Sequence, residues 1–272
     1  MVGASASTPR ELADGKLLLD QPAPGVARLT ICNPAKRNAL DHAILDAIAA
    51  ALGGLDARCV IVTGANDMFS AGYDIGEIPD GEFEQRAESL VAHPFTAAID
   101  ALEAYPYPTV AALGGHTIGG GLELALACDL RVCAANIRLG MPPAKLGLVY
   151  SHTGLQRFLD AIGAPRTREL FLLGGHVDAA TALGWGLVNR MVAGEELPAE
   201  ALAVARELAG HAPLAQRGNK RVIGALLAAR GAVDEQLSEE LLALRRGSFA
   251  SQDMREGMRA FADKRPPCWQ DR

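Results

Sequence analysis

The residues best suited to chemistry gather around a glycine turn. Gly119, Gly120 and Gly121 follow a short apolar run and precede the segment 122–129, which is typical of a helix. Backbone N–H groups at a helix start have no helical partner and carry partial positive charge, so they can hold a negative oxygen. Glu123 lies about one helical turn after Gly120 and can reach back toward that oxygen. The segment predicts an anion-binding turn with an acid or base beside it.

Two phosphate-binding motifs fit this turn less well. A P-loop requires Lys followed by Ser or Thr after its last glycine, whereas Gly119 is followed by further glycines. The dinucleotide motif requires glycine at its first, third and sixth positions, and His116 stands third in the segment 114–119. Taken alone, the turn could also serve only to let a helix and a strand pack closely.

A second glycine turn lies upstream in a similar place. The run 59–64 is typical of a buried strand, and the segment 69–75 follows it after a short polar loop, with Gly72 inside. Parallel strands bring such loops to one edge of a sheet, where open α/β sheets bind ligands. One N–H group from each loop would then form an oxyanion hole for a carbonyl oxygen that gains charge.

These segments resemble the crotonase, or enoyl-CoA hydratase/isomerase, superfamily. The resemblance extends from about Lys16 onward and rests on the segments 33–40, 69–75, 119–129, 182–188 and 256–265. It implies an α/β fold of the crotonase type, a spiral of ββα units with a C-terminal helical trimerisation region. It also implies an acyl-CoA thioester substrate and an oxyanion hole made by the backbone N–H groups of Tyr73 and Gly120. Coenzyme A is then part of the substrate, and we expect no separate cofactor and no metal.

Several further positions match the family's CoA-binding segments. The resemblance assigns CoA contacts to Lys36, Arg37, Ala39, Ala71, Asp74, Ile75, Phe261 and Lys264. A Lys-Arg pair suits phosphate groups, although such a pair is also common on an ordinary solvated surface. Phe261 and Lys264 match positions that, in many members, reach the CoA site of a neighbouring subunit.

Which reaction is expected depends on the other acid–base residues of the site beside Glu123. Hydration of an enoyl thioester is expected to use two carboxylates on one water. Glu123 matches the first of these, but Pro143 stands where the family's second glutamate would be, and proline cannot move a proton. The stretch 139–151 is instead similar to the methylmalonyl-CoA decarboxylase branch, with Tyr150 as its tyrosine. Tyr73 stands where that branch has histidine, which leaves the role of the side chain open.

Decarboxylation needs less proton transfer than hydration, because loss of carbon dioxide leaves an enolate that two N–H groups can stabilise. The Tyr150 hydroxyl is the candidate for binding the leaving carboxylate or supplying the final proton, against the alternative of a tyrosine that only packs. Glu123 would orient Tyr150 or a water. His116 and His152 rank below Tyr150, because a lone histidine is usually structural.

Three functions follow from this interpretation. We predict first the decarboxylation of a malonyl-type thioester, methylmalonyl-CoA or ethylmalonyl-CoA. The second hypothesis is an enoyl-CoA hydratase or isomerase that acts through Glu123, and the third is a non-catalytic CoA-binding protein.

The elements that position these residues form a βα alternation followed by helices. Strands are predicted near 26–31, 59–62, 109–113 and 130–132, with helices near 42–52 and 85–104. Further helices are predicted near 166–173, 178–183, 198–211, 213–229, 234–246 and 252–262. We expect a disordered leader over 1–15, the spiral core over 16–200 and a helical oligomerisation region over 201–272, in a homotrimer or a dimer of trimers.

Composition agrees with a metabolic enzyme. A chain of 272 residues can bury a sizeable core, and its net charge of -6 argues against a nucleic-acid-binding surface. No apolar run approaches the length of a membrane span, and the start of the chain lacks the apolar segment of a signal peptide. The five cysteines are odd in number and scattered, as expected of reduced core residues. We therefore expect a cytoplasmic protein without a nucleic-acid or membrane partner.

Overall fold

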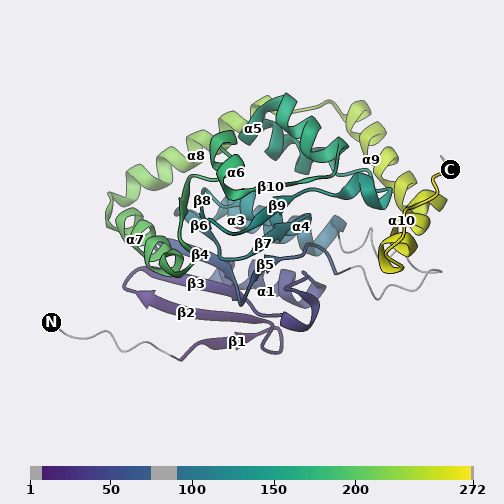
Figure 1. Cartoon of the computed structure of the whole chain (residues 1–272). Coiled ribbons are helices and arrows are strands. Elements are labelled where there is room, and N and C mark those ends of the chain that lie inside the picture. The colour runs from purple at the N-terminus through teal and green to yellow at the C-terminus, as the bar shows by residue number, and fades with distance from the viewer. Residues whose placement is uncertain (1–7, 75–90, 271–272) are drawn as a thin grey trace.

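A computed structural model describes residues 8–74 and 91–270, which form two β-sheets surrounded by helices (Figure 1). The larger sheet contains, in spatial order, β1 (Arg10–Leu12), β2 (Leu17–Ala23), β3 (Val26–Ile31), β4 (Cys59–Gly64), β6 (Thr109–Leu113), β8 (Leu130–Ala134) and β11 (Arg190–Val192). The pairs β1–β2 and β2–β3 are antiparallel, and every pairing from β3 onward is parallel. The βα alternation of the sequence therefore produces a largely parallel sheet, as expected.

The smaller sheet consists of strands of three residues each. Its order is β10 (His176–Asp178), β9 (Arg138–Gly140), β7 (His116–Ile118) and β5 (Met68–Ser70), with β5, β7 and β9 parallel and β10 antiparallel. The pairs β4–β5, β6–β7 and β8–β9 each begin in the larger sheet and end in the smaller one. This repetition is the mixed α/β architecture that the resemblance implies.

The helices pack on the two sheets or extend beyond them (Figure 1). In chain order they are η1 (Pro34–Lys36), α1 (His42–Gly54), the π-helical turn η2 (Val91–Phe95), α3 (Thr96–Ala104), α4 (Gly120–Ala127), η3 (Pro143–Leu146), α5 (His152–Leu172), α6 (Ala179–Trp185), η4 (Gly194–Glu196), α7 (Leu197–Gly210), α8 (Pro213–Arg230), α9 (Glu235–Ala250) and α10 (Gln252–Ala262). α1 begins where the Asp41 side chain accepts a hydrogen bond from the Ile44 N–H, which is a normal helix N-cap.

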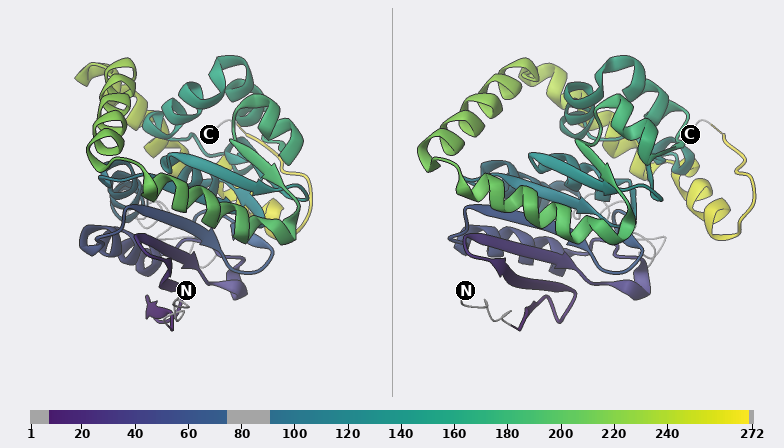
Figure 2. Two further views of the ribbon diagram at one scale, coloured as in Figure 1. Left: turned by 90° about the vertical axis from the view of Figure 1, so that its left-hand side faces the viewer. Right: turned by 60° about the vertical axis from the view of Figure 1, so that its left-hand side comes forward.

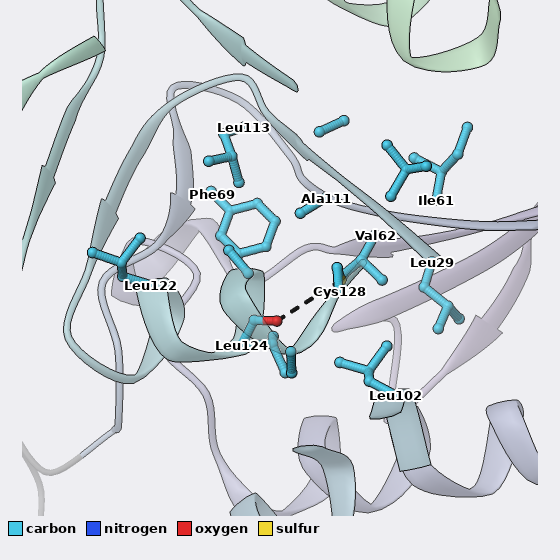
Figure 3. Packing of buried hydrophobic residues seen from close by; sticks show 14 of the residues in the cluster. Leu29, Ile61, Val62, Phe69, Leu102, Ala111, Leu113, Leu122, Leu124 and Cys128 are labelled. Carbon is cyan, nitrogen blue, oxygen red and sulfur yellow. Dashed lines mark hydrogen bonds between the residues drawn. The ribbon is translucent and has the colours of Figure 1, made fainter. Parts of the chain in front are cut away.

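The hydrophobic core anchors α4, the helix that begins at the glycine turn. Phe69 of β5, Leu113 of β6 and Leu122 and Leu124 of α4 are fully buried (Figure 3). Burying each such side chain contributes roughly 1.5–3 kcal/mol relative to leaving it exposed. The first turn of α4, with Gly120 and Glu123, is therefore held in a fixed position relative to both sheets.

The C-terminal helices extend away from the sheets. In Figures 1 and 2, α8 stands apart from both sheets, and none of its residues is buried in the chain. Its apolar side chains Leu214, Val222, Ile223 and Leu226 are exposed. Among the described residues, no helix combines the length and apolar character that crossing a membrane requires.

Most predicted elements are confirmed, with local differences. The four predicted strands and the helices α1, α7, α8, α9 and α10 are present. α5 begins at His152, well before the predicted start at 166, and α7 crosses the expected boundary at residue 200. Of the predicted helix over 85–104, residues 85–90 lie outside the described residues. β1 lies within the expected leader over 1–15 and pairs with β2, which follows that segment.

Candidate active site

The two glycine turns meet at the ends of β5 and β7, which pair in parallel. Gly72 has a φ of +96° and Gly119 a φ of +57°, values that residues with a side chain rarely adopt. A Cβ on Gly72 would lie 3.0 Å from the Ile118 carbonyl oxygen and 3.1 Å from the Gly120 nitrogen. The turns are therefore in backbone contact, as expected for loops at one sheet edge.

The backbone around Tyr73 and Gly120 suits an oxyanion hole. The Leu40 N–H donates to the Gly72 carbonyl at 2.8 Å and the Asp74 N–H donates to the Leu40 carbonyl at 3.0 Å. Because alternate amides of an extended strand face opposite sides, the N–H of Tyr73 points away from Leu40. Gly120 is the first residue of α4, where N–H groups have no helical acceptor. The oxyanion role of both groups stays a prediction that this geometry supports.

Glu123 is a buried carboxylate with a separate donor for each oxygen. Its residue is only 2% exposed, and a buried charge is tolerated only where partners compensate it. The Tyr150 hydroxyl donates to Oε2 at 2.5 Å, and Arg157 Nη1 donates to Oε1 at 3.2 Å. The structure thus brings together Glu123 and Tyr150, the two residues that the sequence analysis selects for catalysis.

Tyr150 is held by close packing as well as by this hydrogen bond. It immediately precedes the N-cap of α5, and its ring meets Phe171 edge-on at 5.4 Å between centroids. Gly154 allows α5 to approach, because a Cβ there would lie 2.7 Å from Tyr150 Cε1 and 2.8 Å from Glu123 Oε1. The position of the phenol relative to the carboxylate is therefore fixed.

The side chain of Tyr73, whose role the sequence leaves open, joins the same site. Its hydroxyl lies 3.2 Å from the Tyr150 hydroxyl. Because a phenol has one O–H group and Tyr150 donates its own to Glu123, Tyr73 is the donor to the Tyr150 oxygen. The hydrogen bonds therefore run in one direction, from Tyr73 through Tyr150 to Glu123.

Arg157 is a site residue that the sequence analysis does not identify. Its Nε and Nη2 donate to the two oxygens of Glu103 at 2.6 and 3.1 Å, while Nη1 reaches Glu123. A guanidinium that binds one carboxylate through two atoms is held in a defined orientation. Arg157 consequently connects α5 to α3 and α4 and presents a fixed positive charge to Glu123.

Burial dominates the ionisation of these groups. It raises the pKa of the Glu123 carboxyl above its ordinary value, while the charge of Arg157 and the hydrogen bond from Tyr150 oppose that rise. Burial, followed by the negative charge of Glu123, raises the pKa of Tyr150 and of Tyr73 well above the usual range. Both phenols are therefore neutral donors at physiological pH.

A proline, which cannot transfer a proton, occupies the position where the second carboxylate is expected. Pro143 is buried at the start of η3, where the family pattern has the second glutamate. Glu103 is another carboxylate in the network, but Arg157 stands between it and Glu123, and its side chain is 45% exposed. Of the two side chains that donate hydrogen bonds to Glu123, Tyr150 and Arg157, the phenol is the one able to give up a proton.

Five residues assigned to CoA lie together at one end of the oxyanion loop: Lys36, Arg37, Ala39, Ala71 and Asp74. The Ala71 N–H donates to the Arg37 carbonyl at 3.1 Å, and Lys36 Nζ lies 2.8 Å from Asp74 Oδ2. Ala39 is buried, and Ile75 lies outside the described residues. The segments 36–39 and 71–74 thus form one surface, and their contacts with CoA stay predictions.

The other two residues assigned to CoA lie at the end of α10. Phe261 is strongly exposed there, and Lys264 follows the helix with a φ of +53°. Met254, near the start of α10, packs in a small cluster with Tyr73 and Leu148. α10 therefore borders the site at its beginning, and Phe261 lies about two helical turns further along.

The two histidines near these loops differ in environment. His116 Nδ1 accepts a hydrogen bond from the Arg138 N–H at 3.0 Å, which indicates a structural role at the sheet edge. His152 is the first residue of α5, and its Nδ1 is buried without a hydrogen-bond partner in the described part of the chain. Within the described part of the chain, neither histidine is hydrogen-bonded to Glu123 or Tyr150.

Comparison with known proteins decides the family. Residues 22–272 match the model of the family described as enoyl-CoA hydratase/isomerase. The chain belongs to this family. It is a crotonase-family enzyme that acts on CoA thioesters, which removes the non-catalytic hypothesis.

Relatives of this crotonase-family enzyme carry different activities in their names. A probable enoyl-CoA hydratase of Mycobacterium bovis is 36% identical over 249 residues, covering 89% of this chain and 93% of the relative. A carnitinyl-CoA dehydratase of Citrobacter koseri is 34% identical over 228 residues, covering 79% and 82%. The structure of methylmalonyl-CoA decarboxylase complexed with 2S-carboxypropyl CoA has a TM-score of 0.86 at 27% identity, covering 94% of this chain and 98% of the other. The comparisons therefore show the family. Because the relatives' names differ in reaction, the reaction of this chain has to be inferred from its site.

Proposed function

We propose that this enzyme decarboxylates a malonyl-type CoA thioester such as methylmalonyl-CoA or ethylmalonyl-CoA. The observation that carries the proposal is the pairing of Glu123 with the Tyr150 phenol, combined with Pro143 in the place of a second carboxylate. The overall similarity to methylmalonyl-CoA decarboxylase supports it. One oxygen of Glu123 accepts from Tyr150 and the other from Arg157, so Glu123 is placed to act on a substrate through Tyr150.

The reaction breaks the bond between the α-carbon and the carboxyl carbon of the substrate. The electron pair of that bond passes into the thioester as an enolate, and carbon dioxide leaves. The N–H groups of Tyr73 and Gly120 stabilise the enolate oxygen, and one such donor is typically worth about 10²–10³ in rate. The α-carbon then takes up one proton, which gives propionyl-CoA from methylmalonyl-CoA.

The Tyr150 hydroxyl supplies that proton. Its raised pKa keeps it protonated, and the thioester enolate carbon is a strong enough base to accept a proton from a phenol. Before the transfer the hydroxyl donates to Glu123, which Arg157 holds in place, and for the transfer its single O–H group turns from Glu123 to the α-carbon. Solvent returns a proton to the phenolate at the end of the cycle, so that one proton is consumed for each carbon dioxide released.

A second candidate is hydration, dehydration or isomerisation of an enoyl thioester through Glu123. It is favoured by the names of the relatives at 34–36% identity. Burial raises the pKa of Glu123, and a raised carboxyl pKa suits a group that both takes and gives a proton. Each carboxylate oxygen can accept a second hydrogen bond, so Glu123 can bind a water or take a substrate proton while Tyr150 and Arg157 stay in place.

The assembly and the location are part of the same proposal. The exposed apolar side chains of α8 are suited to contacts between copies of the chain in a homotrimer or a dimer of trimers. We place the enzyme in the cytoplasm.

One screen separates the candidate reactions. The purified protein is incubated with methylmalonyl-CoA, ethylmalonyl-CoA and crotonyl-CoA, and the products are identified by mass spectrometry. The proposal predicts propionyl-CoA and butyryl-CoA with release of carbon dioxide. Hydroxybutyryl-CoA from crotonyl-CoA, with no product from either malonyl-type thioester, would establish the second candidate instead.

A further inference from the structure

The Tyr73 side chain extends from the predicted oxyanion hole to the hydroxyl of Tyr150. Its own N–H is one predicted oxyanion donor, and its hydroxyl lies 3.2 Å from that of Tyr150. A Cβ on Gly120 would lie 2.8 Å from Tyr73 Cε1 and 3.0 Å from both Cδ1 and Cζ. The ring therefore lies directly against the glycine that provides the other donor.

The ring is held in this position from several directions. Phe95 meets it edge-on at 4.7 Å between centroids, with an angle of 85° between the ring planes. Phe95 is itself buried and ends η2, a π-helical turn of the kind that is frequent at functional sites. Met254 and Phe249 form a cluster against which Tyr73 packs, and Tyr150 binds its hydroxyl. Moving the ring aside would cost all of these contacts.

This position determines how much room an acyl group has. A thioester oxygen that accepts from both N–H groups places the carbonyl carbon, and the acyl carbon bonded to it, next to the ring. An acyl chain that extends from there toward Tyr150 runs along Tyr73 and meets the packed phenols at the far end. A large ring packed between Gly120 and the Tyr150 hydroxyl leaves less room there than a small side chain would.

We infer that the Tyr73 ring is the specificity-determining group of the acyl site and restricts it to acyl chains of few carbons. This inference rests on the oxyanion hole of the proposed function and not on the reaction that follows. It accounts for the packing of a bulky side chain between the oxyanion turn and Tyr150. Substrates of this enzyme are accordingly short-chain thioesters, whichever bond is broken.

Binding of saturated thioesters tests the inference without turnover. Dissociation constants of propionyl-CoA, hexanoyl-CoA and decanoyl-CoA are measured by calorimetry for the wild type, Tyr73→Ala and Tyr73→Phe. The wild type should bind propionyl-CoA at least about tenfold more tightly than decanoyl-CoA, a difference of about 1.4 kcal/mol. Tyr73→Ala should reduce this preference about tenfold, and Tyr73→Phe should keep it because the ring remains.

Two further variants make the result decisive. Tyr107→Ala removes a half-buried ring that packs with Arg217, and it should leave the preference unchanged. Tyr73→Val, checked by circular dichroism, repeats the test if Tyr73→Ala does not fold. Equal binding of short and long chains by the wild type, or an unchanged preference in the small variants, would overturn the inference. Carbon dioxide release from methylmalonyl-CoA is measured separately, so that the proposed reaction and the chain-length limit can fail independently.

Discussion

The Tyr150 hydroxyl donates a 2.5 Å hydrogen bond to Glu123 Oε2, and both side chains are buried. The contact joins the first turn of α4 to the segment before α5, which are 27 residues apart in the chain. A hydrogen bond from a neutral phenol to a carboxylate is short and strong in a dry environment. The carboxylate in the first turn of α4 therefore holds the Tyr150 phenol in place.

Removing the Tyr150 hydroxyl should slow decarboxylation strongly. Tyr150→Phe keeps the ring packing against Phe171 and loses the proton donor, so we expect kcat to fall about 10²–10⁴-fold. The affinity for propionyl-CoA should change little. Tyr105→Phe is the matched control, because it removes a buried hydroxyl that binds only the Ala57 backbone, and its kcat should stay close to wild type. Equal kcat losses in the two variants would contradict the assignment.

Removing the positive charge beside Glu123 should move the pH profile. Arg157 lowers the pKa of Glu123, so that Arg157→Gln should raise it further. Activity that requires ionised Glu123 is lost as the pH falls through this pKa, and the acid limb of kcat against pH should therefore shift to higher pH. Arg157→Lys retains the charge and should shift it less. If Arg157→Gln lowers kcat uniformly at every pH, Arg157 has a structural role only.

Added bulk at Gly154 should separate Tyr150 from Glu123 without removing either side chain. The new Cβ of Gly154→Ala would lie within 2.8 Å of Tyr150 Cε1 and Glu123 Oε1, which forces both to shift. We expect kcat to fall at least about tenfold, a loss of about 1.4 kcal/mol in transition-state stabilisation. Gly53→Ala, which meets no atom within 4 Å, should retain full activity. A Gly154→Ala enzyme as active as the Gly53→Ala control would show that the contact is unimportant.

The exposed face of α8 should determine the assembly. Leu226→Glu places a charge among the exposed apolar side chains of α8, so we expect it to convert the predicted trimer to monomers. Light scattering after size-exclusion chromatography measures the mass directly. The charge change Glu195→Lys, at an exposed position in η4, should leave the mass unchanged. A monomeric wild type would refute the predicted trimer.

The strands β3, β4, β6 and β8 of the larger sheet could be predicted from sequence because they carry a clear signal. β4 and β6 are largely apolar and buried, as parallel strands usually are, whereas β3 and β8 include Arg28 and Arg131 among buried apolar residues. The smaller sheet could not be predicted, since its strands are three residues long and too short to show a period. β1, β2 and β11 of the larger sheet were not predicted either; β1 and β11 are three residues long, like the strands of the smaller sheet.

Only those site residues that lie beside a recognisable local motif could be predicted from the sequence. Glu123 and the two turns are adjacent to strong glycine signals, whereas Arg157 looks like an ordinary helix surface residue in the sequence. The helix that carries it was predicted to start late, because Gly154, Gly163 and Pro165 are unusual inside a helix. Gly163 has a φ of +73° and marks a kink within α5. The contact from Arg157 to Glu103 joins residues 54 positions apart, which no local pattern reveals.

The most direct test of the account is the release of carbon dioxide from methylmalonyl-CoA, followed with the conversion of crotonyl-CoA in the same enzyme preparation. The account predicts that methylmalonyl-CoA gives propionyl-CoA and one carbon dioxide, and that Tyr150→Phe removes most of this activity while Tyr105→Phe retains it. It also predicts that crotonyl-CoA is converted far more slowly. Rapid hydration of crotonyl-CoA with no carbon dioxide from methylmalonyl-CoA would contradict it.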